Sequence, residues 1–142
     1  MENYKAEEKI HQLEDIDLSG TYSYADYLNW EINERLELIR GKIFKMSPGP
    51  TSIHQRISAI VHTEIGYFLK TRSCRAFAAP FDVRFPDHST SNEEILTVLQ
   101  PDICIICDLS KIDNKGCLGA PDIIVEILST GNNQKELKYK YE

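Results

Sequence analysis

Two acidic residues interrupt otherwise apolar runs of the sequence. Asp102 comes directly before Ile103–Cys107, and Glu126 lies within Ile123–Leu128. Burying an ionised carboxylate without a partner costs several kcal/mol, so each acid needs a cation, a proton or a metal ion. Two carboxylates on adjacent strands can share a hard divalent ion such as Mg²⁺, which takes oxygen ligands and bridges to phosphate oxygens. Phosphoryl chemistry is therefore one interpretation of this pair.

A structural role is the alternative interpretation of both acids. One acid would lie near a strand end and the other would pair with Lys138 or Lys140, because ion-pair networks also form without function. Asp122 precedes Glu126 by four residues, which is about 13 Å along a strand and too far to share one ion. We expect Asp122 to cap the start of that strand.

The acids require strands to position them. The sequence predicts two short strands in Leu36–Met46 around a turn at Arg40-Gly41, and a half-buried strand over Phe81–Phe85. Leu96–Cys107 and Pro121–Leu128 are apolar runs typical of central strands. A polar connection over residues 108–120 would separate these two runs.

Helices are expected on either side of these strands. Ser23 can cap a helix that extends to about Asn33, and residues from Asn133 onward are helical by composition. The strongest pattern is one buried helical stripe with spacings of 4, 3, 1, 4, 3 and 1. That stripe consists of Ile53, Ile57, Ile60, Val61, Ile65, Phe68 and Leu69. The expected class is an α/β or α+β layer fold.

The composition fits a single globular domain. The chain has 142 residues, of which 42% are hydrophobic and 27% charged, so it can bury a core. We expect an irregular arm over residues 1–20 and one domain over residues 21–142. No apolar run approaches the length of a membrane span, and the N-terminus lacks an export signal, so a cytoplasmic location is expected.

The cysteines and the charge distribution limit the possible ligands. Cys104, Cys107 and Cys117 have the residue type of zinc ligands, but Cys104 and Cys107 would point to opposite faces of a strand. Together with Cys74 they are expected to be reduced thiols, and no zinc site is predicted. The formal net charge is -6, yet residues 35–84 contain nine basic and three acidic residues. The distribution permits a basic surface for a polyanion, although an ordinary solvated face is the alternative.

Four motifs occur in one order along the chain: Leu36–Gly41, His54–Ile57 after Pro48, Gln100–Asp102, and Gly119–Ser129. Together they resemble the Uma-two family of restriction endonucleases, in the PD-(D/E)XK nuclease superfamily, over about residues 22–142. The resemblance implies a restriction-endonuclease-like central mixed sheet flanked by helices.

The resemblance also implies a metal site and a catalytic lysine. Asp102 matches the first metal-binding aspartate of the motif and Glu126 its second acid, which makes both ligands of Mg²⁺ or Mn²⁺. The superfamily's lysine usually stands two residues after the second acid, where this chain has Leu128. Family members place a lysine on the following helix instead, and Lys140 matches that spacing, with Lys138 as the second choice.

Two further candidate site residues follow from the resemblance. Glu37 matches an acid of the family's early hairpin, and His54 matches a histidine that opens the long helix. The alternatives are a surface acid that pairs with Arg35 or Lys42, and a helix-start histidine that faces solvent or a backbone carbonyl.

The leading hypothesis is therefore a Mg²⁺-dependent endonuclease that hydrolyses DNA phosphodiesters. A homodimer is expected, because cutting both strands usually needs two active sites. The alternative is a catalytically inactive nuclease-like module that binds nucleic acid or protein. Leu128 at the usual lysine position favours that alternative. So does the C-terminus, which lies within an expected helix where family members continue into further strands, so truncation is expected.

Overall fold

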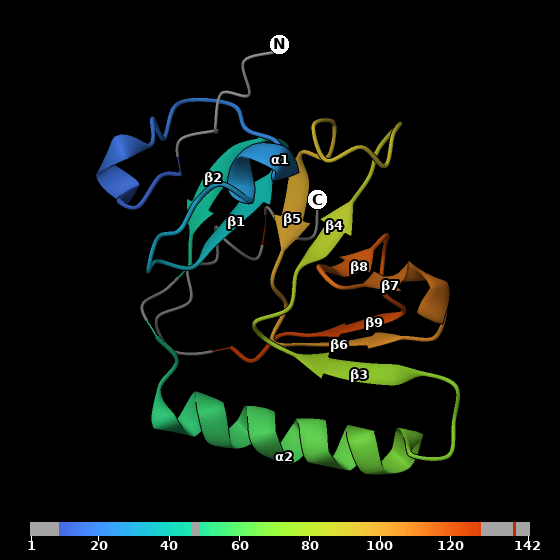
Figure 1. Cartoon of the computed structure of the whole chain (residues 1–142). Helices are drawn as coiled ribbons and strands as arrows, with labels where there is room; N and C mark the ends of the chain where they lie inside the picture. The colour runs from blue at the N-terminus through green and yellow to red at the C-terminus, as the bar shows by residue number, and fades with distance from the viewer. Residues whose placement is uncertain (1–8, 47–48, 129–137, 139–142) are drawn as a thin grey trace.

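The computed structural model describes residues 9–46, 49–128 and 138 (Figure 1). Its helices are α1 (Tyr24–Tyr27) and α2 (Ser52–Leu69), with short 3₁₀ turns at Leu13–Asp15 and Leu109–Lys111. Its strands are β1 (Leu36–Ile39), β2 (Lys42–Lys45), β3 (Arg75–Ala78), β4 (Val83–Phe85), β5 (Thr97–Leu99), β6 (Ile103–Ile106), β7 (Ile112–Asp113), β8 (Gly116–Leu118) and β9 (Ile123–Val125). None of the helices in this part of the chain has the length and apolar content needed to span a bilayer.

The described strands form two sheets, the larger of which is mixed, as expected for the central sheet. One has the order β2-β1-β5-β4-β8-β7 and is mixed, because β4 and β8 are parallel; the other has the order β3-β6-β9 and is antiparallel. The apolar run Leu96–Cys107 is divided between them. Pro101 lies in the middle of that run and has no N–H to donate to a ladder. The run therefore breaks into β5, in the first sheet, and β6, in the second.

The predicted hairpin near the N-terminus is confirmed. β1 and β2 pair antiparallel around Arg40 and Gly41, whose φ angles of 50° and 78° are both positive, as a two-residue type I′ hairpin turn requires. A Cβ atom at Gly41 would lie 2.6 Å from the Thr21 side chain, so this position also needs glycine for space.

The helix predicted from Ser23 is shorter than expected. The Ser23 cap is confirmed, with a reciprocal capping box to Asp26, but α1 ends at Tyr27. The chain then turns to pair with the N-terminal segment, where Ile10 N–H donates to Asn29 O and Glu31 N–H donates to Ile10 O. Asn29 N–H and Trp30 N–H still donate three residues back, to Asp26 O and Tyr27 O, so the tertiary hydrogen bonds replace the helical ones from Glu31 onward.

The predicted long helix is confirmed as α2, which lies along β3 (Figure 1). The expectation of one buried stripe is wrong for most of its members. Leu69 is buried, and Val61 and Ile65 are half-buried. The exposed members are Ile53, Ile57, Ile60 and Phe68. The stripe covers a wider arc of the helix than the sheet can contact.

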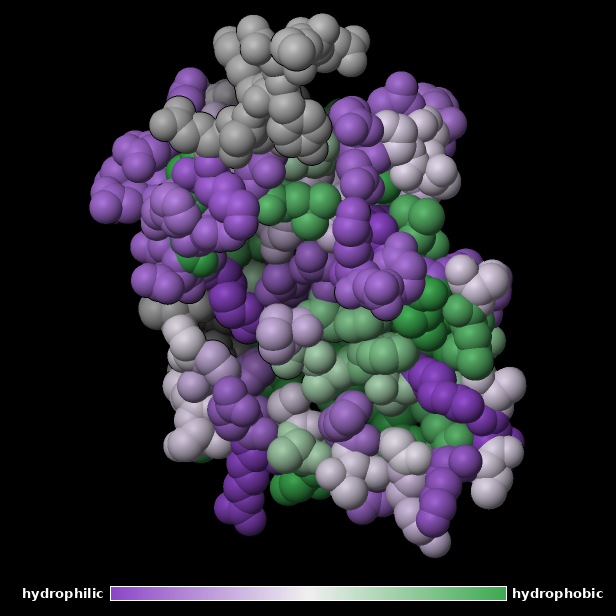
Figure 2. All heavy atoms as spheres, in the orientation of Figure 1, coloured by the Kyte–Doolittle hydropathy of each residue, from purple (hydrophilic) through white to green (hydrophobic). Residues whose placement is uncertain are grey.

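Two buried clusters form the core of the described residues. Tyr24, Leu38, Ile95 and Val98 make up the first, and Val83, Cys104, Ile106 and Cys117 the second. Beside them, the buried guanidinium of Arg84 donates to Asp113 at 2.6 Å and lies over the Tyr24 ring. Asp113 belongs to the β7–β8 hairpin, which completes the mixed sheet. A polar connection without strands was expected over these residues. Figure 2 shows hydrophobic surface over the region of β7, β8 and β9 on one face of the molecule.

The expectation of four reduced cysteines is wrong for two of them. Cys74 and Cys107 form a disulfide, whereas Cys104 and Cys117 are free and buried. The reason is the register of β3 and β6, in which Arg75 pairs with Ile106. One residue further along, Cys74 faces Cys107. This pairing depends on strand register and is invisible in the sequence. Cys104 and Cys117 are the small buried hydrophobic residues that we predicted.

We predict that reduction of the Cys74–Cys107 disulfide lowers the free energy of unfolding by about 2–4 kcal/mol, because the bond closes a loop in the unfolded chain. Urea unfolding with and without reductant measures this difference. A Cys74→Ser/Cys107→Ser variant should be insensitive to reductant. Equal stability of the wild type in both conditions would contradict the prediction.

Candidate active site

The structure brings Asp102 and Glu126 to the same end of the three-stranded sheet. β6 and β9 are antiparallel, with Ile103 opposite Val125. Extending this register by one residue places Asp102 opposite Glu126. Residues directly opposite each other in an antiparallel pair project to the same face, with Cβ atoms about 4.5–5.5 Å apart. The two acids that looked out of place in the sequence therefore stand one residue beyond the last pair of this ladder, at the same end of the sheet.

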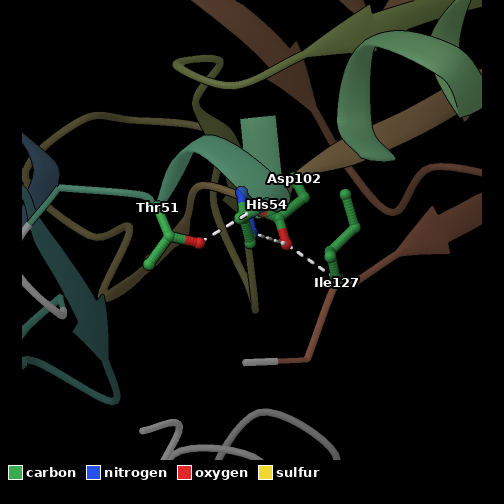
Figure 3. A network of polar contacts seen from close by, with 4 residues as sticks. All are labelled: Thr51, His54, Asp102 and Ile127. Carbon is green, nitrogen blue, oxygen red and sulfur yellow. Dashed lines mark hydrogen bonds and ion pairs between the residues drawn. The ribbon is translucent and has the colours of Figure 1, made fainter. Parts of the chain in front are cut away.

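The Asp102 carboxylate is fixed by contacts from two other segments (Figure 3). Its Oδ2 accepts a hydrogen bond from the Ile127 backbone N–H at 2.7 Å, and the same oxygen lies 3.3 Å from His54 Nε2. An ionised carboxylate only accepts hydrogen bonds, so the contact with His54 requires the proton on Nε2. The backbone of Asp102 is held as well, because its carbonyl accepts from Ala79 N–H at 2.9 Å.

His54 reaches Asp102 because of the way α2 begins. The Thr51 side chain caps the helix and accepts a hydrogen bond from His54 N–H at 3.2 Å. This cap orients the first turn, from which the imidazole points to the acid at the sheet end (Figure 3). His54 is half-buried and contacts a carboxylate, so it does not match the alternative of a histidine that faces solvent or a backbone carbonyl.

Glu37 is also tied to the segment that contains Asp102. It is buried in β1, and its Oε1 accepts a hydrogen bond from Gln100 N–H at 2.8 Å. The alternative of a surface acid paired with Arg35 or Lys42 is wrong. Arg35 donates to the Gln100 side chain, and Lys42 donates to backbone carbonyls elsewhere.

The side chain of Gln100 forms a polar network that sequence reasoning missed. Its Oε1 accepts two hydrogen bonds from Arg35, each at 3.1 Å. Its Nε2 donates to Tyr27 Oη at 3.0 Å and to Asp82 Oδ1 at 2.9 Å. The residues of this network are far apart in the chain, and only the tripeptide Gln100–Asp102 marked the place in the sequence.

Burial changes the titration of two groups in this network. It raises the pKa of Asp82, although hydrogen bonds from Gln100 and Tyr27 oppose that effect. Burial, followed by the charge of Asp82, raises the pKa of the Tyr27 hydroxyl. An acid whose pKa is raised in the folded state binds its proton more tightly there than in the unfolded chain, so it makes folding less favourable as the pH rises.

Whether the acids could hold a metal ion depends on their donor atoms. Asp102 and Glu126 offer carboxylate oxygens, which fit a hard ion such as Mg²⁺ that keeps several waters. Across residues 9–46, 49–128 and 138, no group of three or more His, Cys, Asp or Glu side chains is placed to hold a metal ion. The donor chemistry of the two acids suits a hard ion that takes its other ligands from water or substrate oxygens.

Other residues named from the sequence are placed apart from this cluster or lie outside the described residues. Asp122 accepts a hydrogen bond from Cys107 N–H at 2.7 Å, so its carboxyl group caps the end of β6, where we had expected it to cap the start of its own strand. Lys138 is exposed. Lys140 lies outside the described residues, and so does the helix expected from Asn133 onward except for Lys138. The choice between Lys140 and Lys138 as the catalytic lysine therefore stays a prediction.

We predict that Asp82→Asn weakens the dependence of stability on pH. In the wild type, the raised pKa of Asp82 should make stability decrease as the pH rises above the ordinary value of 3.8. Asparagine keeps the acceptor oxygen for Gln100 and does not ionise. Urea unfolding of both proteins between acidic and neutral pH measures the difference. Parallel pH profiles would contradict the assignment, and the exposed Asp87→Asn serves as the control.

Comparisons with known proteins give the chain its family. A family model described as "Putative restriction endonuclease", Uma2, matches residues 24–142. A crystal structure from Anabaena variabilis, described as a "putative nuclease belonging to DUF820", matches with a TM-score of 0.59 and 25% sequence identity. The match covers 83% of this chain and 64% of that chain. No curated protein matches the chain.

The structural match agrees with the expected restriction-endonuclease-like fold, a mixed α+β arrangement with a large mixed sheet and few helices. The family model covers most of the chain and includes all five candidate site residues. The chain belongs to the Uma2 family, whose model carries that description.

Proposed function

We propose that the protein is a metal-dependent endonuclease that hydrolyses phosphodiester bonds of DNA. The family and the structural neighbour both support a nuclease function. The observation that carries the finer proposal is the register of β6 and β9, in which Ile103 lies opposite Val125. Asp102 and Glu126 adjoin this pair, so two oxygen donors stand at one sheet end, and the proposed ion is Mg²⁺, with Mn²⁺ as a substitute.

The proposed chemistry assigns a task to each residue. A divalent ion bound by Asp102 and Glu126 would supply positive charge beside the scissile phosphate and lower the pKa of an attacking water. The Ile127 N–H orients the Asp102 carboxylate. His54 Nε2 lies 3.3 Å from the same carboxylate and positions it from the first turn of α2.

Glu37 and the lysine complete the proposed site. Glu37 positions the Gln100 backbone, and through it the segment that leads to Asp102. A lysine ammonium, from Lys140 in this proposal, would stabilise the negative charge that develops on the phosphate. The same site without a working lysine is the inactive alternative, which Leu128 at the usual lysine position favours.

DNA is the proposed partner. The proposed assembly is a homodimer, in which each copy of the chain cuts one DNA strand, and its proposed location is the cytoplasm. Exposed basic residues in the basic stretch lie on the first hairpin, within α2 and just after it. They are Arg40, Lys42, Lys45, Arg56, Lys70, Arg72 and Arg75. Arg84 belongs to the same stretch but is buried against Asp113, so it adds nothing to a DNA surface.

We predict that Asp102→Asn and Glu126→Gln each lower metal-dependent cleavage of plasmid DNA by about 100-fold or more, because each removes a carboxylate charge from the metal site. Calorimetric titration of Mn²⁺ should show metal binding in the wild type and its loss in both variants. Asp122→Asn is the matched control, since it changes an acid beside β9 that binds a backbone N–H instead.

Equal cleavage by the wild type and both variants would indicate a contaminating nuclease and contradict the proposal. A folded wild type that binds no metal would support the inactive module instead. DNA binding by that module, if present, should weaken steeply with salt, because phosphate contacts release counterions.

We predict that Lys140→Met reduces cleavage more than Lys138→Met does. Both substitutions remove one charge and keep the length of the side chain. A difference between their cleavage rates would therefore reflect the position of the lysine in the site. Metal binding should be unchanged in both variants, because neither lysine is a proposed ligand. Equal cleavage rates in the two variants would contradict the choice of Lys140.

A further inference from the structure

One side of α2 exposes a row of large apolar residues. They are Ile53, Ile57, Ile60, Tyr67 and Phe68. Exposed fractions of 71% at Ile53 and 78% at Tyr67 show that little of the described chain covers the two ends of the row. Contiguous apolar surface of this kind usually marks an interaction site.

The exposed row is distinct from the side of α2 that packs on the sheet. The sheet side carries the half-buried or buried residues His54, Ser58, Val61, Ile65 and Leu69. At 100° per residue, the centres of the two rows are about a third of a turn apart. Binding at the exposed row would therefore leave the His54–Asp102 contact in place.

The spacing of the exposed row fits another helix. Ile53, Ile57, Ile60 and Tyr67 follow the 3-4 alternation of a coiled-coil seam, in which Glu64 occupies the remaining position. The helix has 18 residues and is about 27 Å long. Ile60 lies near the middle of the helix, so large apolar residues of the row lie at similar distances on both sides of it.

This arrangement is self-complementary for two antiparallel copies of α2. A two-fold axis near Ile60 brings Ile53 of one copy beside Tyr67 and Phe68 of the other, and Ile60 beside its own counterpart. Interfaces of this isologous kind are the commonest in homo-oligomers. Large aromatic and aliphatic residues that are exposed in the single chain would become buried.

The charges beside the row agree with the same pairing. Arg56 and Glu64 stand four residues before and four residues after Ile60. An antiparallel partner centred at Ile60 brings Arg56 of each copy beside Glu64 of the other, twice per dimer. Both side chains are exposed, and none of the ion pairs among the described residues involves either of them.

We infer that the exposed side of α2 binds a second copy of this chain as an antiparallel helix pair. The inference specifies the surface for the two copies in the proposed function. It depends on packing and charge, not on metal chemistry. Failure of cleavage would leave it standing, and failure of dimer formation would leave the metal site standing.

The test is the mass of the full chain by analytical ultracentrifugation over a range of micromolar concentrations. The wild type should form a dimer, and Ile60→Asp should raise its dissociation constant about tenfold or more, because a charge would be buried at the centre of the pair. Ile57→Asp is a second variant with the same expected direction. Leu18→Asp is the matched control, since Leu18 is an exposed leucine outside α2.

A charge exchange separates this pairing from other contacts. Arg56→Glu and Glu64→Arg should each weaken the dimer, and the double variant should restore it. Circular dichroism verifies that all variants keep their helix content. A monomeric wild type, a dimer unaffected by Ile60→Asp and Ile57→Asp, or a double variant without recovery would each overturn the inference.

Discussion

The two sheets are joined at Gln100–Pro101–Asp102, and hydrogen bonds to carboxylates hold that junction on both sides of the proline. Before it, Gln100 N–H donates to the buried Glu37; after it, the Asp102 carboxylate accepts from Ile127 N–H. Both bonds join a backbone N–H to a carboxyl oxygen, an acceptor that binds more strongly than a neutral one when it is ionised. Because Pro101 has no N–H, these bonds replace part of the ladder that a continuous strand would have formed.

The candidate site depends on this junction. Asp102 follows the break and directly precedes β6, and Glu126 directly follows β9. His54 comes from the first turn of α2, and Glu37 from the first hairpin. Each side chain lies in a regular element or next to one, which limits the geometries that it can adopt. The buried network around Gln100 satisfies polar groups that would otherwise destabilise the fold. The same contacts thus support both folding and the position of the acids.

Helix α2 has separate roles on its two sides. Its sheet side packs on β3 and supplies His54 from the first turn, and its other side leaves apolar residues exposed. The hydrophobic periodicity of the sequence does not separate the sheet side from the exposed side, because the apolar residues of both sides contribute to the same pattern. A segment can therefore be strongly apolar while only part of that surface belongs to its own domain.

The sequence by itself determined the local elements and the identity of the acids. The Arg40-Gly41 turn, the Ser23 cap and α2 follow from residue type and spacing, and Asp102 and Glu126 stand out because charge is costly in apolar strands. Tertiary structure decided the rest: the division at Pro101, the Cys74–Cys107 pairing, the Gln100 network and the exposed side of α2. Each of these depends on strand register or on contacts between distant segments. Local propensity does not determine strand register or contacts between distant segments, because more than one register can satisfy the same hydrophobic pattern.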